Sequence, residues 1–261
     1  MKNETGYSPN WDFFFTDIED KPASVFVDLG LNKIRPVRTN PHLLTLEIEM
    51  NFPQENGLSS SDESEKLFEI EDILMKRLEN SFGAILAGRV TTHGLRIIYF
   101  YLKTEKEAGK TIKELMKGFK EYKYIFSLEN DAEWVKYEED LYPAGYEMHT
   151  IMNRHIVEHL RSKGDELSVP REVDHYIFFS SESGKDSFLN AALKLGYKKT
   201  SERLNEKNPD HPITLRVTRI DAVEYNEVID YTSELYDLAE ENDGVYDGWE
   251  TKLVTTANAE K

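Results

Sequence analysis

The chain has 261 residues, 39% of them hydrophobic and 31% charged, a length that fits one large domain or two small ones. Its 49 acidic and 32 basic residues give a formal net charge of −17, which disfavours direct binding to nucleic-acid phosphates or to an anionic membrane, because both need clustered positive charge. The absence of cysteine excludes disulfides, cysteine nucleophiles and thiolate metal sites. No apolar leader and no apolar stretch of about 18 residues is present, so we expect a cytoplasmic protein that does not enter a membrane.

The first half of the chain is predicted to contain six strands and two helices. Aromatic and β-branched runs or alternating apolar residues indicate the strands, and apolar residues at helical spacing indicate the helices. The first two strands form a hairpin that turns at residues 19–22. The expected strands are residues 11–18, 23–29, 44–52, 84–90, 95–102 and 122–128, and the expected helices lie within residues 63–80 and 108–119.

An acidic, polar stretch at residues 129–142 ends in Pro143-Ala144-Gly145, which predicts a domain boundary there. The expected domains are therefore residues 1–145 and residues 146–261. A linking helix from residue 148 to about residue 164 opens the second domain. It is followed by expected strands at residues 173–179, 197–204, 213–220 and 245–254 and by expected helices at residues 188–195 and 225–239.

The order of these elements predicts the fold class, which is α+β. Each half reads strand, helix, strand, strand, helix, strand, the ferredoxin-like order in which two helices cover one face of an antiparallel sheet. The first half adds the N-terminal β-hairpin to this arrangement. We therefore expect two ferredoxin-like domains.

His155-Ile-Val-Glu-His159 matches the H-x-x-E-H pattern of some zinc enzymes. On a helix this spacing places two imidazoles one turn apart, where they can bind zinc while Glu158 acts as a general base. A third ligand should follow, and no downstream segment stands out in that role. The alternative is that both histidines continue a packing stripe with Met148, Ile151 and Met152. We expect this second arrangement, without metal.

Two other segments suggest chemistry only weakly. His175 follows Asp174 on a predicted strand, but neighbouring side chains on a strand point to opposite faces, which prevents an acid–base pair. The run Arg96-Ile-Ile-Tyr-Phe-Tyr101 places aromatic residues on a strand, as in RNA-recognition motifs. It lacks the glycine and aromatic spacing of those motifs, and the net charge opposes phosphate. We expect structural roles for both segments.

The most distinctive segment is Tyr246-Asp-Gly-Trp-Glu250 in the last predicted strand. Strict alternation would place Tyr246 and Trp249 on opposite faces, but Asp247-Gly248 can form a β-bulge. With a bulge, both aromatic side chains face the helix that carries Tyr225, Ile229 and Leu235, and Asp247 and Glu250 face solvent as an acidic edge.

This segment resembles the end of the regulator of ribonuclease activity B (RraB) family, whose domains finish in a Tyr-Asp-Gly-Trp strand. Lys163-Gly-Asp165, Asp174-His175 and the Lys194-Leu-Gly-Tyr197 junction are also similar to that family, so the resemblance covers roughly residues 148–254. It implies a ferredoxin-like fold and a non-catalytic protein that binds the endoribonuclease RNase E outside its active site. Glu250 departs from the glycine of the type member.

The first half resembles an uncharacterised bacterial domain that often precedes RraB. The residues that carry this resemblance are Asn10-Trp-Asp-Phe-Phe-Phe-Thr-Asp17, Lys21-Pro-Ala23, Gly57-Leu58 and Gly88-Arg-Val-Thr-Thr-His-Gly94. No function for this domain follows from the resemblance.

Together these observations predict a non-catalytic, acidic regulatory protein that needs no cofactor or metal. Its expected partner is a basic protein, because opposite potentials favour association. The family resemblance implies that this partner is a ribonuclease. The expected partner-binding residues are Asp243, Asp247 and Glu250, and the expected structural residues are Tyr246, Gly248 and Trp249. The alternative is a metal-dependent hydrolase that uses His155, Glu158 and His159.

Overall fold

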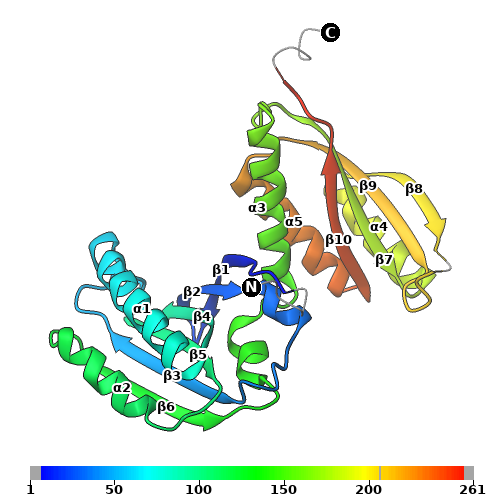
Figure 1. The fold of residues 1–261 in the computed structure, drawn as a ribbon. Coiled ribbons are helices and arrows are strands. Elements are labelled where there is room, and N and C mark those ends of the chain that lie inside the picture. Colours follow the sequence, from blue (N-terminus) through cyan, green and yellow to red (C-terminus); the bar gives the residue numbers. More distant parts are fainter. Residues whose placement is uncertain (1–6, 206, 256–261) are drawn as a thin grey trace. The chain divides into compact units, whose positions relative to one another are not determined.

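The computed structural model describes residues 7–205 and 207–255 (Figure 1). The chain divides into two compact units, Met1–Glu147 and Met148–Lys261, each with its own sheet. Among the described residues, no helix is both long and apolar enough to span a bilayer.

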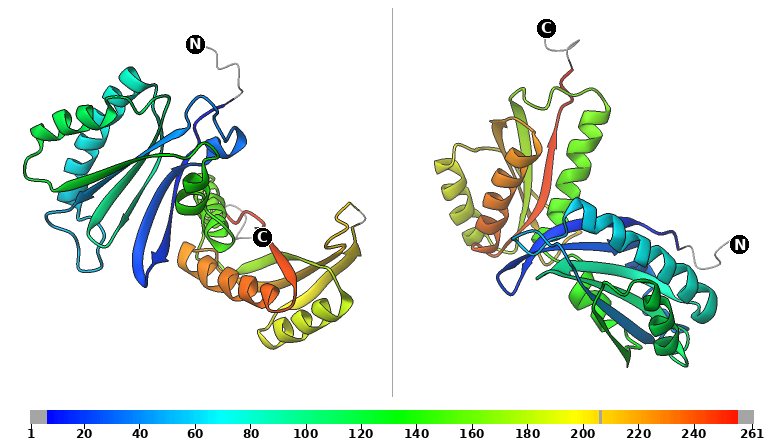
Figure 2. Two further views of the ribbon diagram at one scale, coloured as in Figure 1. Left: turned by 90° about the horizontal axis from the view of Figure 1, so that it is seen from below. Right: turned by 90° about the vertical axis from the view of Figure 1, so that its left-hand side faces the viewer.

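The N-terminal domain is built around a β-α-β-β-α-β unit, extended by a hairpin. Its six strands form one antiparallel sheet in the order β1-β2-β4-β5-β3-β6, and α1 and α2 lie on one face of it (Figures 1 and 2). Strands β4, β5, β3 and β6 have the ferredoxin-like order, and the hairpin adds β1 and β2 at the β4 edge. The elements are β1 (Trp11–Ile18), β2 (Lys21–Asp28), β3 (His42–Glu49), α1 (Ser61–Phe82), β4 (Ile85–Thr92), β5 (Leu95–Leu102), α2 (Ala108–Leu115) and β6 (Tyr124–Asn130).

The core of this domain lies between the sheet and its two helices. Side chains of β3 and β5 alternate, so every second residue points to the helices. Helix α1 begins after Ser60, whose hydroxyl accepts a hydrogen bond from the Glu63 amide, and it ends at Gly83 in the left-handed conformation (φ 56°). The buried residues include Leu44, Leu46, Ile48, Leu67, Ile70, Leu74, Ile98, Phe100 and Ile112.

The opposite face of the same sheet is covered by the acidic, polar stretch that precedes the predicted domain boundary. Trp134 is fully buried and stacks on Tyr101 with ring centroids 3.8 Å apart. The Trp134 indole N–H donates to the Asn40 carbonyl at 3.0 Å, and the Tyr101 hydroxyl donates to Asp131 at 2.6 Å. Residues 131–142 are therefore part of the N-terminal domain, because their aromatic side chains fill a second core layer.

The C-terminal domain consists of helix α3 followed by a complete β-α-β-β-α-β unit. Its four strands are antiparallel in the order β10-β7-β9-β8, again the ferredoxin-like arrangement. Helices α4 and α5 lie on one face of the sheet (Figures 1 and 2). The elements are α3 (Tyr146–Ser162), β7 (Arg171–Phe179), α4 (Glu182–Lys194), β8 (Lys198–Leu204), β9 (Ile213–Asp221), α5 (Tyr225–Glu240) and β10 (Gly244–Thr251).

Two buried clusters form the core of the C-terminal domain. One joins α4 and α5 to the sheet through Ile177, Phe179, Phe188, Leu215, Leu235 and Tyr246. The other joins α3 and α5 to the sheet through Val157, Leu160, Val173, Val228, Tyr231 and Trp249. The predicted fold class, two ferredoxin-like α+β domains with an N-terminal hairpin, is confirmed.

Candidate functional site

The last strand, β10, contains the bulge that the Asp247-Gly248 pair predicts. Its register against β7 shifts between Tyr246 and Gly248, and Gly248 adopts φ 137°, a conformation that residues with a Cβ rarely adopt. The bulge resets the alternation of the strand. Tyr246 and Trp249 are therefore both buried on the helix-covered side, while Asp247 and Glu250 are exposed.

Trp249 lies inside the domain and is only 6% exposed. Its indole N–H donates to Asn153 Oδ1 of α3 at 2.8 Å, and Asn153 Nδ2 donates to the Thr232 hydroxyl of α5, also at 2.8 Å. Trp249 packs against Val228 and Tyr231 of α5. Both aromatic side chains thus face the predicted helix: Tyr225 packs against the cluster of Trp249, and Leu235 belongs to that of Tyr246. Only Ile229 lies outside the buried stripe of α5, which contains Val228 and Thr232 instead.

Tyr246 contacts a buried histidine rather than solvent. Its hydroxyl lies 2.8 Å from His175 Nδ1, and the His175 ring packs edge-to-face on Tyr197 and Tyr231. Burial, together with the positive charge of Arg219, lowers the pKa of His175 to about 3, so this imidazole is neutral at physiological pH.

Asp174 lies on the other face of β7, where it accepts hydrogen bonds from Thr218 and Arg216. An acid–base pair between Asp174 and His175 is therefore absent.

The low pKa of His175 predicts acid sensitivity of the C-terminal domain. In the unfolded chain a histidine titrates near 6.5, so below that pH protonation favours unfolding by about 1.4 kcal/mol per pH unit until the folded-state pKa is reached. The contribution of neutral His175 to the free energy of unfolding is therefore fully present above pH ~6.5. It is lost progressively as the pH falls towards ~3. Replacing His175 with phenylalanine should reduce the loss of unfolding free energy between pH 7 and pH 4.5 by about 2 to 3 kcal/mol. Calorimetric melting at the two pH values measures this difference, and an unchanged pH dependence would contradict it.

The expected partner-binding residues lie on the surface. Asp243, Asp247 and Glu250 are all exposed, and the carboxylate of Glu250 accepts a hydrogen bond from Tyr176 on the neighbouring strand. This hydrogen bond raises the pKa of Tyr176, because it favours the neutral hydroxyl.

Helix α5 carries further acidic residues that the sequence analysis did not single out. Glu227, Asp230, Glu234, Asp237 and Glu241 recur at intervals of three and four residues, which places them on one helix face. Residues 225–251 contain nine acidic residues and no Lys, Arg or His, and all nine are exposed. We call seven of them, on α5 and in the turn after it, the acidic surface: Glu227, Asp230, Glu234, Asp237, Glu240, Glu241 and Asp243. Glu250 of β10 lies on the opposite face of the sheet, next to Tyr176. The spacing of three and four residues between the acids of α5 was the signal in the sequence that could have identified the acidic surface.

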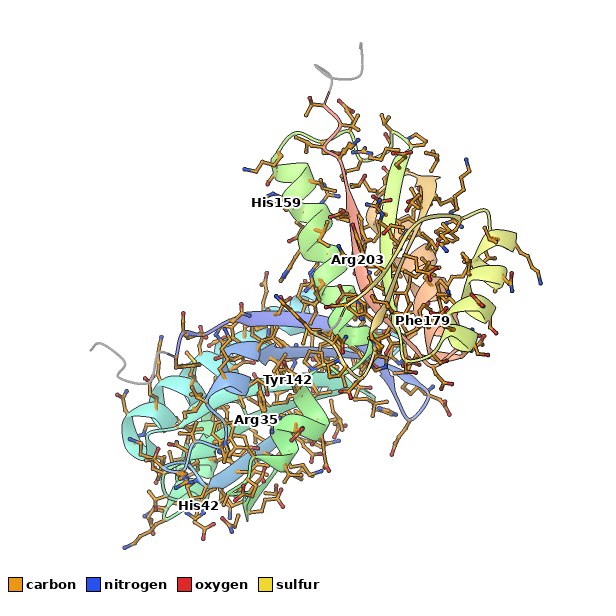
Figure 3. All side chains as sticks on the ribbon, turned by 90° about the vertical axis from the view of Figure 1, so that its right-hand side faces the viewer. Arg35, His42, Tyr142, His159, Phe179 and Arg203 are labelled. Carbon is orange, nitrogen blue, oxygen red and sulfur yellow. The ribbon has the colours of Figure 1, made fainter. Side chains whose placement is uncertain are left out.

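The H-x-x-E-H residues of α3 do not form a metal-binding cluster with other described side chains. His155, Glu158 and His159 are exposed on α3, and His159 lies near its C-terminal end (Figure 3). The predicted packing stripe is wrong except at Ile151, because Met152, His155 and His159 are exposed. Beside Ile151, α3 buries Asn153, Val157 and Leu160. In the described part of the chain, no three His, Cys, Asp or Glu side chains are grouped so that they could hold a metal ion.

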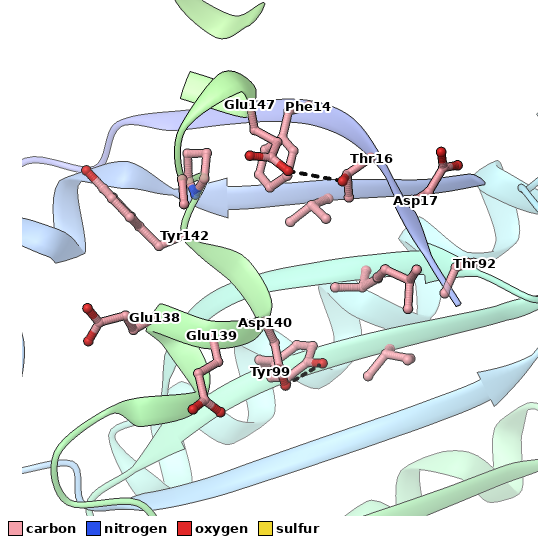
Figure 4. A pocket seen from close by; sticks show the side chains of 16 residues that line it. Phe14, Thr16, Asp17, Thr92, Tyr99, Glu138, Glu139, Asp140, Tyr142 and Glu147 are labelled. Carbon is pink, nitrogen blue, oxygen red and sulfur yellow. Dashed lines mark hydrogen bonds between the residues drawn. The ribbon is translucent and has the colours of Figure 1, made fainter. Parts of the chain in front are cut away.

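The N-terminal domain has a cavity of about 510 Å³ on the sheet face opposite α1 and α2 (Figure 4). Acidic side chains dominate its polar lining: Asp17, Glu138, Glu139, Asp140 and Glu147. The Tyr99 hydroxyl donates to Asp140 at 3.2 Å, and the Thr16 hydroxyl donates to Glu147 at 3.1 Å. The negative charge makes this cavity unfavourable for anionic ligands.

A crystal structure described as that of a glycine cleavage system transcriptional repressor is 9% identical, with 81% of this chain and 98% of that chain covered. Its TM-score is only 0.22. A search of the curated proteins finds no match.

Two family models match consecutive parts of the chain. Residues 9–142 match a family of unknown function, DUF695, over about half of the chain. Residues 150–251 match Regulator of ribonuclease activity B, a region that runs from α3 to the end of β10. Both resemblances noted in the sequence are thereby confirmed. The chain therefore belongs to the DUF695 family, and its C-terminal domain matches the RraB family of regulators of ribonuclease activity.

Proposed function

We propose that the protein is a non-catalytic regulator that binds a ribonuclease through its C-terminal domain. The observation that carries this proposal is the RraB match, which spans the whole ferredoxin-like unit of that domain. RNase E is the enzyme that the family resemblance implies. In this proposal the partner contributes a basic segment outside its catalytic site, and the chain contributes the acidic surface.

The position of the acidic residues supports a role in binding. Asp237, Glu240 and Glu241 lie at the C-terminal end of α5, where the helix dipole disfavours negative charge. Like charges three or four residues apart on a helix also repel each other. These carboxylates therefore do not stabilise the helix that carries them, and a basic partner supplies the missing opposite charge.

This argument predicts opposite effects on binding and on stability. The triple variant Asp237→Asn, Glu240→Gln, Glu241→Gln should weaken binding to purified RNase E by at least about 10-fold, since loss of each charge pair costs a few tenths to 1 kcal/mol or more. The same variant should melt at an equal or slightly higher temperature, because repulsion at the end of α5 is removed. Titration calorimetry with the full chain measures binding, and scanning calorimetry measures melting.

A matched control changes the net charge equally at another place. Glu65, Asp72 and Glu79 are exposed acids on α1 of the N-terminal domain. Their replacement by Gln, Asn and Gln should leave binding unchanged, and binding of the unaltered chain should weaken as salt rises. Equal weakening by both triple variants would show that only net charge matters. Absence of any binding between the unaltered chain and RNase E would refute the proposed partner.

A further inference from the structure

A second cavity in the N-terminal domain, of about 470 Å³, has a chemical character opposite to that of the first. It lies on the α1 side of the sheet, where β1 and β2 extend beyond the core covered by α1 and α2. Phe13, Phe15 and Phe68 contribute apolar surface to its lining and are 39%, 61% and 44% exposed. Aromatic side chains that remain this exposed beside a cavity are typical of binding sites.

The charged side chains that line this cavity, among the described residues, are two arginines, Arg89 and Arg96. Behind them, Glu71 of α1 pairs with Arg89 at 2.7 Å and approaches Arg96 only to 3.9 Å. The side chains of Arg89, Arg96 and Glu71 are 15%, 4% and 9% exposed. Two guanidinium groups facing one carboxylate leave one uncompensated positive charge in a buried position, in a chain whose net charge is −17.

Arg96 is incompletely satisfied by the protein. Its Nε and Nη1 atoms are buried and have no hydrogen-bond partner. Leaving buried donors of a charged group unpaired costs free energy that an anionic ligand can recover. Burial and the neighbouring Arg89 lower the pKa of Arg96 to about 10, which still leaves it protonated at neutral pH.

Aromatic rings hold the two guanidinium groups in place. The Arg89 guanidinium lies 4.0 Å from the centroid of Phe26 and 4.9 Å from that of Phe68, and the Arg96 guanidinium lies 5.4 Å from that of Phe68. The cavity thus has a preorganised cationic wall next to an exposed apolar wall. Its volume falls within the usual range for small-molecule sites.

We propose that this cavity binds a small organic anion, in which a carboxylate or phosphate group pairs with Arg96 and an attached aromatic or apolar group packs against Phe15 and Phe68. The acidic cavity on the opposite face of the sheet is of similar size but would repel the same ligand. This binding activity belongs to the N-terminal domain and does not depend on the function proposed for the C-terminal domain.

Probes of known structure test both parts of the site on the full chain. 3-Phenylpropionate and phenyl phosphate distinguish a carboxylate from a phosphate ligand, and 3-phenylpropionamide is the uncharged control. We expect saturable binding of at least one anionic probe in titration calorimetry. The amide should bind at least about 10-fold more weakly than the acid, which is the effect of losing one charge-assisted hydrogen bond.

Two variants then locate the binding. Arg96→Gln retains the Arg89–Glu71 pair and should weaken binding of the anionic probe by about 10-fold or more. Phe15→Ser should weaken binding of the aromatic anions but not of inorganic phosphate. Phe52→Ser is the matched control, because Phe52 is 77% exposed and does not line the cavity.

Three results would overturn the proposal: no saturable binding of either anionic probe, equal affinity for the acid and the amide, or affinity unchanged by Arg96→Gln. Scanning calorimetry of each variant establishes that it is folded. If Arg96→Gln does not fold, the comparison of acid with amide and of Phe15→Ser with Phe52→Ser still decides the question.

Discussion

Replacing Trp249 with alanine should lower the free energy of unfolding of the C-terminal domain by about 3 to 5 kcal/mol, the usual cost of truncating a buried tryptophan. The variant loses the packing against Val228 and Tyr231 and leaves Asn153 Oδ1 without its donor. For a domain of ordinary stability this is a large fraction of the total. Scanning calorimetry of the full chain should show that the melting temperature of this domain is strongly lowered.

Two further variants separate the contributions at Trp249. Trp249→Phe retains most of the ring volume but removes the donor to Asn153, so we expect a smaller loss of about 1 to 3 kcal/mol. Val245→Ala on the same strand is the control, because Val245 is 45% exposed, and its effect should stay within about 0.5 kcal/mol. If Trp249→Ala melted normally but no longer bound its partner, Trp249 would be a contact residue instead of a structural one.

A second large effect is expected at Trp134 in the N-terminal domain. Trp134→Ala should cost about 3 to 5 kcal/mol, because the ring is fully buried on Tyr101 and its indole N–H satisfies the Asn40 carbonyl. The measurement is the calorimetric transition of the N-terminal domain. Val135→Ala is the control at a neighbouring position that is 46% exposed. It should change the free energy of unfolding of this domain by less than about 0.5 kcal/mol.

The Trp134 experiment also tests the extent of the domain. If residues 131–142 were only a linker, removing the largest side chain in them would leave both domains unaffected. A normal melting curve for Trp134→Ala would therefore contradict the second core layer that the structure shows. A selective loss in the N-terminal transition would agree with it.

The fold class could be predicted from sequence because its signals are local. Strand alternation, helical spacing and the order of elements each depend on neighbouring residues, and together they specify two ferredoxin-like units. The bulge at Asp247-Gly248 could also be predicted, since glycine allows the required backbone angle. The spacing of acids on α5 was visible in the same way, although its position on an exposed helix face needed the structure.

The tertiary structure alone decided which distant side chains meet. Residues 131–142 are predicted only as an acidic, polar stretch because five of the twelve are acidic, yet Trp134 and Tyr137 complete a core layer against β5. Asn153 lies on a helix that seemed to bury a histidine stripe, and its pairing with Trp249 joins positions 96 residues apart. The sequence shows that Arg96 belongs to an aromatic strand, but only the packing shows that its side chain lies beside those of Arg89 and Glu71. No local pattern encodes such contacts, because they depend on which faces of separate elements are brought together when the chain folds.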